Sequence, residues 1–250
     1  MLLYSVLLLC VVLIPTLGIK RVNSVEKYFN VCRRDNPKIE DCVRNSIETL
    51  RPRLVGGINE IGIPPLEPLQ IPEIKLEEDT GAIALYSSYT NISIHGLSKC
   101  EIREIKIDLE NNYMQLKVHF PSLELNANYK ISGKIMMMPL QGEGLCNGNF
   151  TDVDVTSFIK TGTDMRNGKE HLTVEDIGVN FEIGSTSVNL DNLFNGDQDL
   201  GSAVNKFLNE NWQSIMTEIK PTLEDKMAHI IKLIAAKLFE TFSYAELLPP

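Results

Sequence analysis

Residues 200–242 read LGSAVNKFLNENWQSIMTEIKPTLEDKMAHIIKLIAAKLFETF, and this stretch decides the fold. Its apolar side chains recur every three or four residues, which is the spacing of an amphipathic helix. They are Leu200, Val204, Leu208, Trp212, Ile215, Ile219, Leu223, Met227, Ile231, Ile234, Leu238 and Phe242. One straight helix of this length would measure about 60 Å, whereas a compact domain of this size has a radius of gyration of about 17 Å. We therefore expect an elongated molecule, with a helix that is kinked at Pro221 and covered by the rest of the chain.

Between Ile83 and Leu190 the apolar period changes to two, which predicts an antiparallel meander with one buried face. The longest alternating run extends from Leu123 to Met137 and would span about 45–50 Å as a single strand. This length is comparable with that of the C-terminal stripe, so the pattern predicts an α+β fold in which the sheet curls around the helix. Turn signals occur at Asn111-Asn112, Gly142-Glu143-Gly144, Asn147-Gly148 and Asn167-Gly168.

The N-terminal third begins with a predicted secretory signal peptide, residues 1–18, because residues 2–14 are almost unbroken apolar and small residues follow. A retained membrane anchor is the alternative, although the run is short for a membrane span. Residues 19–250 are expected to form one domain. In it, Asn36-Pro37 predicts the start of a helix that ends near Gly56-Gly57. Residues 61–74 contain four prolines and should follow an extended path along a surface.

The charge and the cysteines limit the class of protein. A net charge of −9 argues against nucleic acid and against anionic membrane as main partners. Without the signal peptide the chain keeps an even number of cysteines, which suits an oxidising compartment. The short spacing of Cys32 and Cys42 favours their pairing, and this would leave Cys100 to pair with Cys146. Three connectivities are possible, and the sequence does not decide between them.

The sequence contains little that suggests catalysis. The four histidines, His95, His119, His171 and His229, are all out of phase with the apolar positions around them, so none is expected in the interior. Neither a hydrolase, a metalloprotease nor a phosphate-binding motif is present, and we expect no enzyme activity, metal or cofactor. Asn91-Ile92-Ser93 and Asn149-Phe150-Thr151 are N-glycosylation sequons whose asparagines, Asn91 and Asn149, should face water.

The chain resembles the insect takeout and juvenile-hormone-binding protein family over nearly its whole length. The resemblance rests on the order and spacing of several segments: Cys32, 42–50, 57–74, 96–98, 129–135, 142–144, 207–212, 220–221 and 242–249. It implies a long C-terminal helix wrapped by a strongly curved sheet around a hydrophobic tunnel. It also implies a secreted, non-enzymatic carrier of lipophilic molecules such as juvenile hormone or fatty-acid-like compounds. The Cys32–Cys42 pair looks like the disulfide typical of the family, whereas the pattern does not require Cys100–Cys146.

We therefore predict a monomeric carrier, secreted into insect haemolymph, of a small juvenile hormone-, fatty acid- or terpenoid-like ligand. The side chains expected to line the tunnel are Val118, Phe120, Leu125, Tyr129, Ile131, Ile135, Met137, Phe181, Phe207, Trp212, Ile215, Met216 and Ile219, with the Tyr129 hydroxyl as the candidate hydrogen-bond donor. The main alternative is a membrane-surface protein that uses its C-terminal amphipathic helix. The helix carries as many acidic residues as lysines, which gives little attraction to anionic lipid. A hydrolase would need a histidine on the interior face, and transient membrane or receptor contact is compatible with a carrier.

Overall fold

The computed structural model describes residues 25–80 and 83–250, so the predicted signal peptide lies outside the described residues. The strands are β1 (Leu69–Thr80), β2 (Ile83–His95), β3 (Glu101–Asp108), β4 (Tyr113–Ile135), β5 (Met138–Arg166) and β6 (Lys169–Leu190). The α-helices are α2 (Ile39–Leu54), α3 (Gln198–Glu210), α4 (Trp212–Thr241) and α5 (Tyr244–Leu247). The short 3-10 helices are η1 (Val25–Lys27), η2 (Asn59–Ile61), η3 (Leu97–Lys99) and η4 (Phe194–Gly196). Among the described helices, none is long and apolar enough to cross a membrane.

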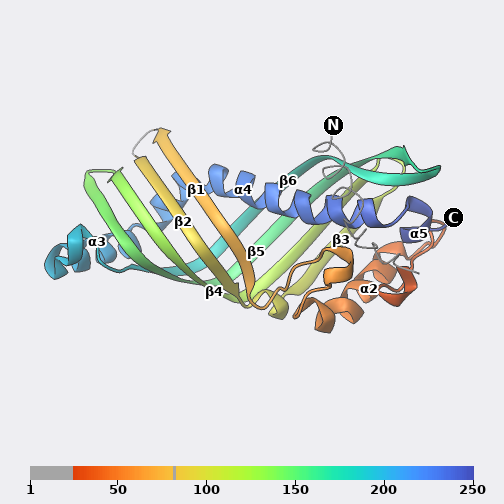
Figure 1. The fold of residues 1–250 in the computed structure, drawn as a ribbon, viewed down its shortest axis with the longest axis horizontal. Helices are drawn as coiled ribbons and strands as arrows, with labels where there is room; N and C mark the ends of the chain where they lie inside the picture. Colours follow the sequence, from red (N-terminus) through yellow and green to blue (C-terminus); the bar gives the residue numbers. More distant parts are fainter. Residues whose placement is uncertain (1–24, 81–82) are drawn as a thin grey trace, which may run out of the picture.

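All the strands belong to one antiparallel sheet in the order β1-β2-β4-β5-β6, and β3 pairs with the first half of β4. The sheet curls around α4, which runs along the long axis of an elongated molecule (Figure 1). This confirms the α+β fold predicted from the two periodicities. Residues 123–135 of the predicted strand 123–137 belong to the longer β4, which extends through Pro121 back to residue 113.

The long strands turn midway along their length (Figure 1), where three irregular residues lie side by side. Pro121 on β4 is opposite Asp152 on β5, and Asp152 is opposite Gly184 on β6, because the pairs on either side are in continuous register. Asp152 has a positive φ of 52°, and a Cβ on Gly184 would lie 2.8 Å from that of Asp152. The buried face therefore changes phase at this line, from odd positions such as Phe181 to even ones such as Leu190 on β6.

The C-terminal helix is interrupted at Asn211, whereas α4 continues through Pro221, so the proline does not end the helix. Asn211 has φ −115° and ψ 17°, and its side-chain amide donates to the Phe207 carbonyl at 2.8 Å. Pro221 is accommodated inside α4. The spacing of four residues between Leu208 and Trp212 preserves the apolar stripe across this break, so hydrophobic periodicity could not reveal it.

Two asparagines of α3 protect the free edge of β6. Asn205 Oδ1 accepts from the Leu190 amide at 2.9 Å, and its Nδ2 donates to the Leu190 carbonyl at 3.0 Å. Asn209 makes the same pair of hydrogen bonds with Val188, both at 2.8 Å. These side chains occupy the place of a neighbouring strand, and they satisfy backbone groups that an edge strand otherwise leaves open.

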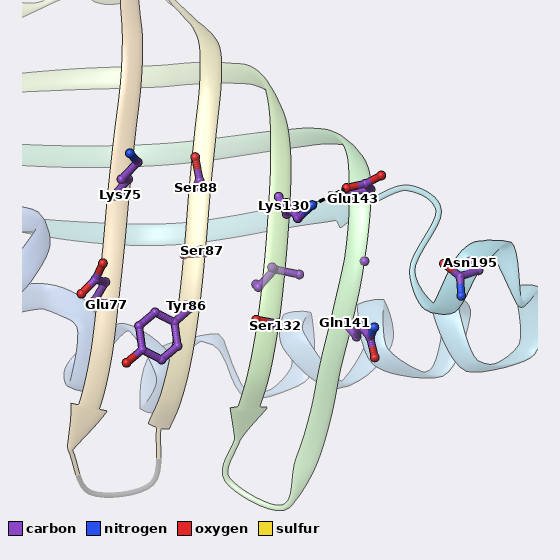
Figure 2. A pocket seen from close by; sticks show the side chains of 12 residues that line it. Lys75, Glu77, Tyr86, Ser87, Ser88, Lys130, Ser132, Gln141, Glu143 and Asn195 are labelled. Atoms are coloured by element: carbon purple, nitrogen blue, oxygen red, sulfur yellow. Dashed lines mark ion pairs between the residues drawn. The ribbon is translucent and has the colours of Figure 1, made fainter.

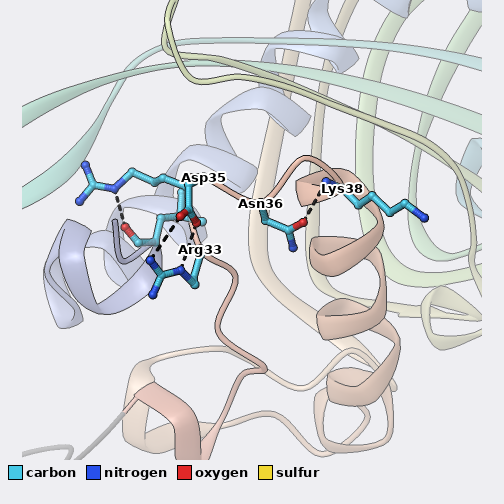
Figure 3. A network of polar contacts seen from close by, with 6 residues as sticks. Arg33, Asp35, Asn36 and Lys38 are labelled. Atoms are coloured by element: carbon cyan, nitrogen blue, oxygen red, sulfur yellow. Dashed lines mark hydrogen bonds and ion pairs between the residues drawn. The ribbon is translucent and has the colours of Figure 1, made fainter.

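The opposite end of the molecule is built around α2 (Figure 1), and Figure 3 shows the polar contacts of the loop that precedes this helix. The helix α2 begins at Ile39, two residues after the start predicted at Pro37. In the turn before it, Asn36 Oδ1 accepts a hydrogen bond from the Lys38 amide at 2.9 Å. Arg33 and Asp35 form an exposed ion pair at 3.1 Å in the loop before it. Leu50, Ile58, Ile61 and Phe242 form a second buried cluster here, and the predicted Cys32–Cys42 disulfide is present.

The predicted Cys100–Cys146 pair is wrong, because both thiols are free. Cys100 immediately precedes Glu101, which pairs with His119 on β4, whereas Cys146 pairs with Ala127. The two positions are therefore separated by about 25 Å along β4 at ~3.3 Å per residue, far beyond the reach of a disulfide. Burial raises the pKa of Cys146 to about 11, which keeps it a thiol.

Two further predictions need correction. Gly142-Glu143-Gly144 and Asn147-Gly148 are not turns but lie inside β5, where a Cβ on Gly144 would stand 2.5 Å from the Asp191 carbonyl oxygen. Gly142 and Gly144 allow the segment after β6 to approach β5 closely at Asp191 and Leu193. His171 is buried, because the β5–β6 hairpin folds onto the end of α4, where its Nδ1 lies 2.8 Å from the Phe239 carbonyl oxygen.

Candidate ligand-binding site

An apolar cavity of about 150 Å³ lies between the concave face of the sheet and the junction of α3 with α4. The sheet contributes Leu76, Glu78, Leu85, Tyr89, Ile131, Ile135, Leu140, Phe150, Thr186, Val188 and Leu190, and the helices contribute Leu208, Asn209, Trp212, Ile215, Met216 and Ile219. A dry space lined by aliphatic and aromatic side chains is suited to an apolar guest.

The interruption at Asn211 helps to form the cavity. Leu208 lies near the end of α3, and Trp212 is the first residue of α4. Both line the cavity, so the two helices meet beside it. On the other side, β1 approaches α4 through a hydrogen bond from the Thr222 hydroxyl to the Glu78 carboxylate. The cavity therefore lies beside the seam between an edge strand and the long helix.

A few polar groups reach this lining, namely Glu78, Tyr89, Thr186 and Asn209. The Asn209 amide is used fully by β6 and α3. Burial raises the pKa of Tyr89 to about 12, so its hydroxyl stays protonated at neutral pH. The Thr186 Oγ1 is buried and has no hydrogen-bond partner within the described part of the chain.

The structure brings some of the predicted lining residues together at this cavity and places others elsewhere. Those at the cavity are Ile131, Ile135, Trp212, Ile215, Met216 and Ile219. Leu125 and Phe207 pack against the same hydrophobic core outside the lining, and Phe181 lies beneath Lys220 on α4. Val118 and Phe120 belong to the half of β4 beyond Pro121. The buried face of β4 changes phase at Pro121, so alternation alone did not distinguish the β4 residues at the cavity from those in the other half of the strand.

Tyr129 and Met137 have roles that differ from the predicted ones. The Tyr129 hydroxyl donates to the Asp191 carbonyl at 2.6 Å, so it fastens the segment after β6 to the sheet and does not line the cavity. Met137 is 96% exposed, because Met136 and Met137 form the two-residue turn between β4 and β5. Met136 adopts a positive φ of 56°. Glycine or asparagine usually occupies such a position, and neither is found at this turn, so the sequence did not indicate it.

A second hollow, of about 520 Å³, lies on the outer face of strands β1, β2, β4 and β5 (Figure 2). Its lining is polar and includes Lys75, Glu77 and Tyr86, together with Lys130 and Glu143, whose charged groups are 3.0 Å apart. These solvated charges make it a poor match for a lipophilic ligand. We therefore take the smaller apolar cavity as the candidate site.

The described residues contain no cluster of three or more histidine, cysteine or acidic side chains that could hold a metal ion. His119 lies on the polar face of β4, 2.9 Å from Asp154, and His171 bonds to a backbone carbonyl. Among the described residues that line the cavity there is no histidine or cysteine. The arrangement can enclose an apolar molecule, and its side chains supply shape and isolated hydroxyl groups.

Comparisons with known proteins support the fold. The profile of the family described as haemolymph juvenile hormone binding protein matches residues 6–249. The circadian clock-controlled protein daywake of Drosophila melanogaster is 23% identical over 241 residues, which cover 90% of each chain. A Schistocerca gregaria protein with the provisional name beta-carotene-binding protein is 25% identical over 221 residues, 86% of this chain and 85% of that one. The crystal structure of Takeout 1 from Epiphyas postvittana matches with a TM-score of 0.75 at 19% identity, covers 88% of this chain and 99% of that chain, and supports the fold alone.

Proposed function

The chain belongs to the haemolymph juvenile hormone binding protein family, and from this premise we propose that it is a secreted carrier of one small lipophilic molecule. The ligand would occupy the cavity between the sheet and the α3–α4 junction. The observation that carries the proposal is the lining itself, which is aliphatic and aromatic apart from a few polar groups. The name of the Schistocerca gregaria relative, which refers to beta-carotene, supports an apolar ligand of this general kind.

The size of the cavity sets a condition on binding. Its volume of about 150 Å³ is below the 300–1,000 Å³ typical of sites that enclose a drug-sized ligand. A juvenile hormone-, fatty acid- or terpenoid-like molecule would therefore enter with one end, or would displace part of the lining. Met216 is the lining residue best suited to move aside, because its side chain is unbranched and adaptable. On the other side of the cavity, the hydrogen bond between Glu78 and Thr222 bridges the seam between β1 and α4.

The energetic scale is compatible with a reversible carrier. Burial of about 400 Å² of ligand surface would contribute roughly 10 kcal/mol. Association costs of at least ~4 kcal/mol reduce this to micromolar or somewhat tighter binding. The proposal includes removal of residues 1–18 on secretion, one domain over residues 19–250, a monomeric state, and glycans on Asn91 and Asn149, whose side chains are both exposed.

The single tryptophan provides a direct test, because Trp212 lines the cavity. Delipidated protein should show saturable quenching of Trp212 fluorescence by a conjugated apolar ligand, and a non-fluorescent lipid should reverse it by competition. A hydrophilic solute of similar size is the control and should change nothing. If the protein takes up none of the apolar ligands tested, and vesicle co-sedimentation shows that it binds lipid surfaces instead, the membrane-surface alternative replaces the carrier.

A further inference from the structure

The outer hollow has a floor of two rows of side chains that lie in register across the sheet (Figure 2). The first row consists of three uncharged side chains on β2, β4 and β5, namely Tyr86, Ser132 and Gln141. The second row, on the same strands, consists of Ser88, Lys130 and Glu143. Their neighbours Leu85, Ile131 and Leu140 line the apolar cavity, so the two rows lie on the opposite face of the sheet and the hollow is a separate site.

The charges of the hollow cancel one another. Among its lining residues, the two lysines Lys75 and Lys130 are balanced by Glu77 and Glu143. Lys130 is paired with Glu143 at 3.0 Å, and Lys75 is paired with Glu73, which lies just outside the lining, at 3.3 Å. A phosphate, sulfate or carboxylate ligand requires an excess of positive charge. The hollow is therefore suited to an uncharged ligand that forms hydrogen bonds.

Tyr86 supplies the apolar part of this surface. The residue is 61% exposed and stands in the hollow beside hydroxyl and amide groups. A tyrosine ring combines an apolar face with a polar tip. The C–H face of a sugar ring can pack against that face, while the sugar hydroxyls bond to Ser132 and Gln141. The volume of about 520 Å³ is within the range of sites that enclose a ligand, so a short neutral oligosaccharide has the matching chemistry and size.

A covalent source of such an oligosaccharide lies on the same strand and on the same face. Asn91, in the sequon that ends at Ser93, is exposed, whereas Ile92 beside it is buried. Asn91 sits in a β-bulge of β2 with a φ of 52°. Three residues separate it from Ser88 in the hollow, which is about 10 Å at ~3.3 Å per residue. The core N-acetylglucosamine residues of an N-glycan can cover this distance.

The other sequon lies farther from the hollow and provides an internal comparison. Asn149 is exposed on β5, on the outer face of the sheet. Its nearest lining residue on that strand is Glu143, six residues away, which is about 20 Å at ~3.3 Å per residue. A glycan on Asn149 therefore begins at about twice the distance from the hollow.

We propose that the N-linked glycan of Asn91 folds back along β2 and occupies the outer hollow, with a sugar ring packed against Tyr86. This inference rests on the glycosylation included in the proposed function and adds the place where one glycan lies. It does not involve the apolar cavity. The glycan of Asn149 stays in solvent, so the two glycans of one molecule differ in their contact with the protein.

The test measures nitration of Tyr86 by tetranitromethane in protein secreted from insect cells, with peptide mass spectrometry to follow the ring and the occupancy of both sequons. If the glycan covers the ring for about nine-tenths of the time, Tyr86 should react about tenfold faster once the glycan is removed. Asn91→Gln and Ser93→Ala both remove the sequon, and agreement between them assigns the effect to the glycan. Asn149→Gln is the matched control and should leave the rate unchanged.

Equal nitration rates in the wild type and in both Asn91-sequon variants would overturn the inference, as would an Asn91 that carries no glycan. Slow nitration that persists in Asn91→Gln and strengthens with protein concentration would identify a second copy of the chain as the occupant, and would also overturn it. Trp212 quenching by an apolar ligand measures the carrier function in the same proteins. It should be equal in all of them, so a failure of this inference is distinguishable from a failure of the carrier function.

Discussion

Filling the cavity should stabilise the protein and abolish binding at the same time. Val188 lines the cavity from β6, and Val188→Phe would extend a ring into the space. An empty cavity costs about 24 cal/mol per Å³, so 150 Å³ corresponds to ~3.6 kcal/mol of lost stability. If the ring fills about a third of the space, the variant should gain roughly 1 kcal/mol, which raises Tm by about 2–4 °C for a chain of this size.

The matched control is Val179→Phe on the same strand. Val179 is 8% exposed and does not line the cavity, so the same added ring has no space to occupy. Overpacking of this kind should lower the stability by about 1–3 kcal/mol. Thermal unfolding of the delipidated proteins measures both changes, and Trp212 fluorescence titration measures binding. The reasoning is refuted if Val188→Phe is destabilised as much as Val179→Phe and still binds ligand like the wild type.

Three further predictions concern the stability of the scaffold. Asn209→Ala leaves backbone groups of the β6 edge without partners, and urea unfolding should show a loss of about 2–4 kcal/mol. Simultaneous replacement of Cys32 and Cys42 by serine opens a loop with a sequence separation of 10 and should lower the free energy of unfolding by roughly 2–3 kcal/mol. Reduction of the wild-type disulfide should give the same loss. The hydrogen bond from Ser243 lowers the pKa of Glu246 from 4.5 to about 2, so the carboxylate stabilises the fold above its unfolded pKa and loses this effect as the pH falls from about 4.5 to 2. Glu246→Gln should therefore be less stable than the wild type at pH 7, and the two proteins should converge near pH 2.

The periodicities predicted the architecture because each follows from a simple geometric rule. Alternation along β4 placed Tyr129, Ile131 and Ile135 in the interior, where the structure has them. The same rule failed at Met137, since the turn at Met136 and Met137 lacks the residues that usually mark a two-residue hairpin. Alternation describes a strand but does not reveal where the strand ends.

Glycine was the main source of error within the sheet. Gly144 and its neighbours were interpreted as turn residues, but they are positions of close approach inside β5. Glycine serves both purposes, and a single sequence does not distinguish them. The cavity lining was only partly predictable for a related reason: Leu76, Phe150 and Val188 come from three strands whose order around the helix is a property of the topology.

Thr186 and Asn209 show a second limit. The predicted lining included neither residue, yet both lie at the cavity. Asn209 is there because it binds the edge of β6, a role that depends on the docking of α3. The sequence pattern of α3 alone does not indicate that a strand edge lies beside this helix.

The most direct test of the carrier function is extraction of the protein purified from its native source. Mass spectrometry of the organic extract should identify a lipophilic compound in an amount close to one molecule per chain. Delipidated protein should bind this compound again and lose the binding in Val188→Phe. Recovery of no such compound, together with delipidated protein that takes up no lipophilic ligand, would contradict the account.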